Sequence, residues 1–117
     1  MINQLESKKE NTLIYEFSEF ITQYDIKKIE KDIEKVLKNR DKVNLMLYVH
    51  VEGENIASFV EEFRAGIKYW NKLNKIAYIG KKEKWARWVV IDNFFTKFKE
   101  KYFELDDIER AWKWLNE

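Results

Sequence analysis

Apolar and polar positions divide the chain into short segments of two different periods. In the segment 12–17, Leu13, Tyr15 and Phe17 share one face, and a nearly continuous apolar run, Val-Asn-Leu-Met-Leu-Tyr-Val-His-Val, fills 43–51. A period of two predicts a strand, and an uninterrupted apolar run predicts a strand that is covered on both faces. We therefore expect 43–51 to be the central strand of a sheet. A short polar stretch joins 1–6 to 12–17, which predicts an antiparallel hairpin.

Apolar residues at helical spacing predict four helices. Thr22 followed by Asp25 predicts the start of the first helix as a short form of the capping box. Further helices are expected over 56–73, over 83–94 and after Asp106 and Asp107, whose charges favour the positive end of a helix dipole. Gly66 is expected to let the second helix approach the sheet closely. The expected buried stripes are Ile26, Ile29, Ile33, Val36 and Leu37 in the first helix, Ile56, Phe59, Val60, Phe63, Ile67 and Trp70 in the second, and Ile108, Ala111, Trp112 and Leu115 in the last.

With strands at 75–79 and 101–104, the element order becomes β-β-α-β-α-β-α-β-α. This order predicts one α/β domain over 1–117: a mixed, mostly parallel sheet of about five strands, joined by right-handed crossovers and covered by helices on both faces. Such sheets bind ligands beyond the carboxyl ends of their strands. The candidate ligand crevice therefore contains Glu52, Gly53, Glu54, Asn55 and Gly80.

Composition narrows the class of protein. The net charge of +1 over 117 residues gives no general attraction to nucleic acid, so we expect no nucleic-acid partner. The absence of cysteine excludes disulfides and thiolate metal sites and fits a reducing compartment. The first residues lack the basic and apolar regions of a signal peptide, and we expect a cytoplasmic protein.

The sequence predicts no catalytic residues, metal site or cofactor. His50 is the only histidine, and its spacing supplies no partners for a metal site or a triad. The adjacent carboxylates Glu61–Glu62 and Asp106–Asp107 would point about 100° apart on a helix, which makes poor acid–base pairs. Gly80 precedes a predicted helix, as a glycine in a phosphate-binding loop does, but the sequence around it contains neither a Walker nor a dinucleotide-binding pattern. We therefore do not expect an enzyme.

The segment 81–101 combines aromatic and basic residues. This segment contains seven basic and three acidic residues, and its apolar residues fall on several sides of a helical wheel. One helix face cannot bury them all, so some apolar surface is left over. Three interpretations stay open: packing against Trp112 and Trp114, a partner or homodimer surface, and contact with a membrane or an apolar ligand. The candidate partner- or lipid-binding residues are Lys81, Lys82, Lys84, Trp85, Arg87, Trp88, Ile91, Phe94, Phe95 and Phe98.

Four stretches of the chain resemble the SpoIIAA-like proteins. They are Phe63-Arg64-Ala65-Gly66-Ile67-Lys68-Tyr69-Trp70, Ile76-Ala77-Tyr78-Ile79-Gly80, Trp85-Ala86-Arg87-Trp88 and the ending Tyr102-Phe103 … Ala111-Trp112-Lys113-Trp114-Leu115. SpoIIAA-like proteins are small bacterial domains related in fold to STAS domains, the group that contains the anti-sigma-factor antagonists. The resemblance implies a mixed sheet surrounded by helices, no enzyme activity and a binding role, with membrane or apolar-ligand association among the suggested roles.

The chain departs from the antagonists at their phosphorylation motif. The antagonists carry an Asp-Ser-Ser-Gly-like motif after the central strand, where this chain has Glu54-Asn55-Ile56-Ala57-Ser58-Phe59. Ser58 lies near the register of the phosphorylated serine, and a phosphate in a first helical turn is chemically tolerable. Because the neighbouring residues of the motif are missing, an ordinary helix-start serine is the favoured interpretation.

The sequence thus predicts a non-enzymatic SpoIIAA-like binding module that acts in protein–protein interaction or regulation through its third helix, on a protein partner or as a homodimer. The alternative is a peripheral protein of the inner membrane face, or one that binds an apolar ligand, using the segment 81–101.

Overall fold

The computed structural model describes residues 2–18, 21–50, 61–63, 65–80 and 99–117. Within them, five strands form one sheet in the order β1-β2-β3-β4-β5. β1 is antiparallel to β2, and every other neighbouring pair is parallel. The strands are β1 Ile2–Leu5, β2 Thr12–Phe17, β3 Val43–Val49, β4 Leu73–Gly80 and β5 Glu100–Glu104, and the labelled helices are α1 Gln23–Leu37 and α4 Ile108–Leu115. The predicted mixed, mostly parallel sheet with β3 at its centre is confirmed.

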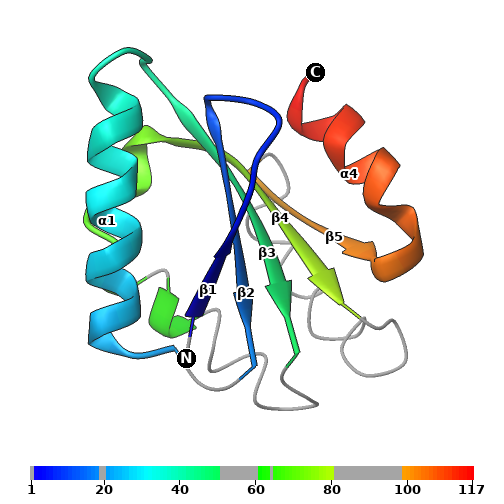
Figure 1. Ribbon diagram of the computed structural model, residues 1–117, viewed down its shortest axis with the longest axis horizontal. Helices are drawn as coiled ribbons and strands as arrows, with labels where there is room; N and C mark the ends of the chain where they lie inside the picture. Colours follow the sequence, from blue (N-terminus) through cyan, green and yellow to red (C-terminus); the bar gives the residue numbers. More distant parts are fainter. Residues whose placement is uncertain (1, 19–20, 51–60, 64, 81–98) are drawn as a thin grey trace.

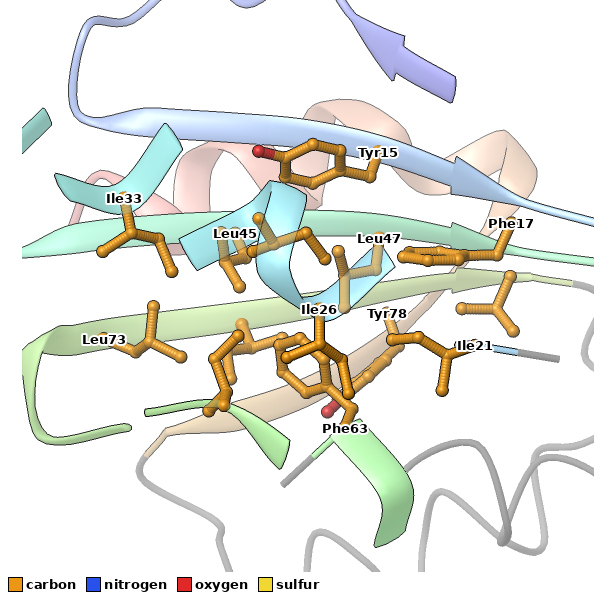
Figure 2. Close-up of a cluster of buried hydrophobic side chains, with 14 of the residues drawn as sticks. Tyr15, Phe17, Ile21, Ile26, Ile33, Leu45, Leu47, Phe63, Leu73 and Tyr78 are labelled. Atoms are coloured by element: carbon orange, nitrogen blue, oxygen red, sulfur yellow. The ribbon is translucent and has the colours of Figure 1, made fainter. Parts of the chain in front are cut away.

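The alternation of side chains along the strands builds two apolar layers. Tyr15, Leu45 and Tyr78 belong to the cluster that α1 and the helical residues 61–63 and 65–66 cover (Figure 2). Met46, the neighbour of Leu45, and Ala77, the neighbour of Tyr78, belong to the cluster that α4 covers. Figure 1 shows α1 and α4 on opposite sides of the sheet. The central strand is buried on both faces, as its uninterrupted apolar sequence predicts.

α1 begins at the predicted capping box. The Thr22 side chain accepts a hydrogen bond from the backbone N–H of Asp25, and the Asp25 carboxylate accepts one from the backbone N–H of Thr22. Both bonds satisfy N–H groups that have no partner inside the helix, which fixes where α1 starts. Ile26, Ile29 and Ile33 then face the core.

A buried polar network holds the middle of α1 against the sheet. The Tyr15 hydroxyl of β2 donates a hydrogen bond of 2.6 Å to Asp32 in α1. Lys28 lies 2.7 Å from the same carboxylate and donates to Gln4 of β1. Burial and the adjacent Asp32 carboxylate together raise the pKa of Tyr15 far above its usual value.

This raised pKa predicts a loss of stability at alkaline pH. Above about pH 10 the unfolded chain ionises its tyrosines while folded Tyr15 keeps its proton, so the free energy of unfolding falls by about 1.4 kcal/mol per pH unit for this residue. Below pH 10 both states are protonated and the residue contributes no pH dependence. Tyr15→Phe should be less stable at neutral pH by about 1 kcal/mol and should lose stability less steeply above pH 10. Urea unfolding from pH 8 to 11 measures the free energy of unfolding of both proteins as a function of pH. Parallel curves for the original chain and Tyr15→Phe would show that Tyr15 is not the source of the alkaline loss.

β4 contains an extra residue opposite Asn44 of β3. Val43 pairs with Leu73 and Leu45 with Ile76, so Asn74 and Lys75 together face the single residue Asn44. The Asn44 side-chain oxygen accepts hydrogen bonds from the backbone N–H of Lys75 and from the side-chain amide of Asn74, both of 3.1 Å. This bulge lets both Leu73 and Ile76 face the core under α1, although an odd number of steps separates them.

The same bulge anchors the end of α4. The Asn44 side-chain amide donates a bond of 3.0 Å to the carbonyl of Leu115, and the Lys75 ammonium donates one of 2.6 Å to the carbonyl of Trp114. Lys75 also lies over the Trp114 ring, and Trp114 packs against Phe103 of β5. Carbonyls at the end of a helix lack helical partners, so these bonds fix where α4 ends against the sheet.

The predicted second helix extends too far. The helical residues 61–63 and 65–66 are followed by a turn at 68–69, a 3-10 helix at Trp70–Lys72 and the start of β4 at Leu73, two residues earlier than predicted. Ile67 and Trp70 still contact the core from this turn, which explains why their spacing imitates a longer helix. Gly66 does approach another element closely, but that element is α1 and not the sheet, because a Cβ atom on Gly66 would overlap the Ile26 side chain.

Candidate functional site

Most residues that the sequence nominates for binding lie outside the described part of the chain. This holds for the candidate partner- or lipid-binding residues in 81–98, for Glu52, Gly53, Glu54 and Asn55 of the crevice, and for Ser58. Gly80 is described and is the buried last residue of β4. Its carbonyl accepts a hydrogen bond from the Tyr102 hydroxyl, so this carbonyl has a structural role.

The structure reveals a hollow that the sequence did not predict. It lies between the start of α1 and the helical residues Glu62, Ala65 and Gly66 and has a volume of about 400 Å³. We call it the α1 hollow; its lining consists of Ile21, Thr22, Gln23, Ile26, Glu62, Ala65 and Gly66. Ile21 and Ile26 are buried, and Figure 2 shows both in the core cluster together with Phe63.

The α1 hollow combines an apolar floor with a polar rim. Thr22 and Gln23 on one side and Glu62 on the other are exposed. The capping box engages the backbone N–H groups of Thr22 and Asp25, and the Thr22 hydroxyl accepts the second of these bonds, so it is committed to the helix. Among the lining residues that the structure describes, none forms a nucleophile–base pair and none is a histidine or a lysine. This composition suits the docking of an apolar side chain better than catalysis.

Tyr24 follows Gln23 of the hollow lining in the sequence but is not itself part of the lining. Its surface is 86% exposed, more than that of either other exposed large hydrophobic residue of the described chain, Leu5 or Leu105. On the helical wheel it lies about 160° from Ile26, which places it on the solvent side of α1. A tyrosine opposite the apolar stripe was visible in the sequence as an exception to the pattern.

His50 forms an ion-pair geometry with Glu16 of β2 at 2.9 Å. Tyr48 pairs with Glu16 in the register of the two strands, and burial, followed by the charge of Glu16, raises the pKa of the Tyr48 hydroxyl. Both His50 and Glu16 are more than a third exposed. No third metal ligand joins this pair among the described residues. The three carboxylates that do lie close together in the described chain are Glu104, Asp106 and Asp107, just before α4. His50 and Glu16 therefore form an exposed surface contact.

Comparison with protein families gives one match, in which residues 12–116 fit the SpoIIAA-like family. No curated protein and no solved structure matches the chain. The match covers every described element except β1, which agrees with the resemblance seen in the sequence. Domains of this family are generally non-enzymatic regulatory modules, and the family implies a protein-interaction module of the anti-sigma-factor-antagonist type. Among the described residues, no helix is long and apolar enough to cross a membrane.

Proposed function

We propose that this chain, which belongs to the SpoIIAA-like family, is a non-enzymatic protein-interaction module that docks its partner at the α1 hollow and Tyr24. The observation that carries the proposal is the apolar-floored hollow, whose rim residue Gln23 is followed directly in the sequence by a tyrosine that is 86% exposed. Exposed tyrosines and pockets that accept a partner's side chain both recur at the energetic centres of protein interfaces.

The size and chemistry of the α1 hollow support a protein partner. Its volume of about 400 Å³ exceeds what a single large side chain fills, so an anchor residue with part of its backbone fits. The polar rim of Gln23 and Glu62 can then hydrogen-bond to the partner's backbone around that anchor. Tyr24 would bury its ring on binding and keep its hydroxyl at the edge of the interface.

The segment 81–101 is retained as a second proposed surface, supported by its sequence alone. Its interleaved aromatic and basic residues favour a partner or homodimer surface, with an anionic membrane or an apolar ligand as the alternative. Tryptophan fluorescence titrated with anionic and neutral vesicles, repeated with Trp85→Ala and Trp88→Ala, distinguishes the two. A salt-sensitive blue shift that either substitution removes would favour the membrane.

Substitutions at the α1 hollow should abolish partner capture without unfolding the protein. Tyr24→Ser removes the exposed ring, and Ala65→Leu narrows the hollow from an exposed position, so each should weaken partner binding by about 30-fold. Quantitative affinity capture from cells of the source organism identifies the proteins that the original chain retains, and calorimetry with the purified partner then gives Kd.

Leu5→Ser is the matched control, because it removes an exposed apolar side chain from β1, away from the hollow. It should leave the captured proteins unchanged. If Tyr24→Ser and Ala65→Leu retain the same proteins at the same levels as the original chain, the proposed docking site is wrong.

A further inference from the structure

The charges of α1 are balanced in the sequence but separated in the structure. Residues 23–37 contain four lysines and four acidic residues, so their net charge is zero. Every acidic side chain of this helix accepts a hydrogen bond from the body of the protein. These bonds join Asp25 to the Thr22 N–H, Glu30 to the Lys68 N–H, Asp32 to the Tyr15 hydroxyl and Glu34 to the Tyr69 hydroxyl.

Three lysines are left on the solvent side of α1. Lys27, Lys31 and Lys35, which we call the lysine ladder, are all exposed. They follow one another at intervals of four residues, which places successive ammonium groups on one face about 6 Å apart along the helix. No hydrogen bond or ion pair within the described residues holds any of the three, whereas Lys28 is paired with Asp32. Tyr24 precedes the ladder on the same face.

The lysine ladder is unfavourable for the helix itself. Like charges four residues apart repel each other, and Glu30 and Glu34, which could offset them at a spacing of three, are engaged elsewhere. A local arrangement that opposes folding and has no compensating contact is characteristic of a surface kept for binding.

We propose that the lysine ladder binds an acidic helix of a partner protein, one that carries carboxylates at intervals of four residues. This inference rests on the proposed function only in taking the chain to be a protein-binding module. Two helices packed side by side place carboxylates with the same spacing opposite all three ammonium groups. Tyr24 then contacts the apolar part of the partner helix at one end of the ladder.

The surroundings of the ladder favour a protein helix over a membrane. Glu30 and Glu34 border the ladder along one side of α1, and exposed Glu62 lies on the neighbouring helical residues. The basic strip is therefore narrow, and a flat anionic surface would also approach these carboxylates. Tyr24 is the only apolar side chain on this exposed face of α1, which gives little to insert among lipids.

The test uses a fluorescein-labelled synthetic helical peptide with glutamate at every fourth position, and a matched peptide with glutamine in those places. The folded full chain should bind the first peptide, and salt should weaken this binding. Lys27→Gln combined with Lys31→Gln and Lys35→Gln should reduce the affinity at least about tenfold. The control variant, Lys8→Gln with Lys9→Gln and Lys113→Gln, has the same net charge and alters exposed lysines outside α1, so its affinity should change less than about twofold.

Lys31→Glu separates binding from folding. A glutamate between Lys27 and Lys35 replaces two repulsions by two attractions, so this variant should lose peptide binding while its melting temperature rises. Weaker binding together with a higher melting temperature cannot result from misfolding.

Three results would overturn the proposal. They are an equal loss of affinity in the ladder and control variants, no binding of the glutamate peptide, and ladder-dependent binding of phosphatidylserine vesicles in place of the peptide. If the peptide binds through the ladder while Tyr24→Ser and Ala65→Leu leave partner capture unchanged, the α1 hollow fails as the docking site and the ladder stands. If those two variants lose their partner, while the ladder variant keeps the partner and does not bind the peptide, the α1 hollow stands as the docking site and the ladder proposal fails.

Discussion

Asn44→Ala should lower the free energy of unfolding by about 3 kcal/mol, although no large apolar side chain is removed. The buried Asn44 side chain makes three hydrogen bonds, to the carbonyl of Leu115, to the N–H of Lys75 and to the amide of Asn74. Alanine leaves the first two backbone groups without these partners inside the protein, and an unsatisfied buried polar group costs more than an average hydrogen bond contributes. The substitution should also loosen α4, because Asn44 and Lys75 hold the carbonyls of Leu115 and Trp114 from the sheet.

Urea unfolding measures the loss, and amide hydrogen exchange in α4 shows whether the helix opens before the sheet. Asn74→Ala is the control, since Asn74 is exposed and contributes a single bond to the same oxygen. It should cost less than about 1 kcal/mol. A loss below about 1 kcal/mol for Asn44→Ala, or unchanged exchange in α4, would show that the bulge is held mainly by the strands.

The sheet could be predicted because its signals are local and strong. β2 occupies the predicted residues, β3 lies at the centre, and the Thr22–Asp25 capping box forms as its spacing indicates. In each case the residues that give the signal also make the contact, so knowledge of distant partners is not needed.

The bulge and the end of the second helix could not be predicted because both depend on partners far away in the sequence. Asn44 interrupts an otherwise apolar strand, and its role follows only from Lys75 and Leu115, up to 71 residues away. The spacing of Ile67 and Trp70 continues a helical pattern, but both contact the core from a turn. A hydrophobic pattern records which side chains are buried and not the backbone conformation that buries them.

The candidate site was hidden for the same reason. Residues 23–37 have no net charge, and only the engagement of Glu30 and Glu34 by Lys68 and Tyr69 leaves a one-sided basic face. The α1 hollow joins residues from two segments about 40 positions apart. The surface predicted in 81–101 has strong compositional signals, and it remains a prediction.

Gly66→Leu should destabilise the protein by about 3 kcal/mol and remove partner binding at the α1 hollow. A Cβ atom at this position already overlaps the Cδ1 atom of Ile26, which is buried in the core under α1. Because a leucine adds several atoms beyond Cβ, we expect it to push α1 away from the helical residues 61–63 and 65–66, and these two segments are the walls of the hollow. Ala65→Leu, one residue earlier and exposed, should change the unfolding free energy by less than about 0.5 kcal/mol.

A double-mutant cycle tests whether Ile26 is the cause. Gly66→Ala should cost about 1.5 kcal/mol through overpacking, and Ile26→Val, which deletes the overlapping methyl group, should cost about 1 kcal/mol alone. The double variant should cost less than the sum by about 1 kcal/mol, because the shortened side chain makes room for the new Cβ atom. Additive costs would mean that the clash is relieved elsewhere. The close approach at Gly66 would then not be what sets the distance between α1 and the opposite wall of the hollow.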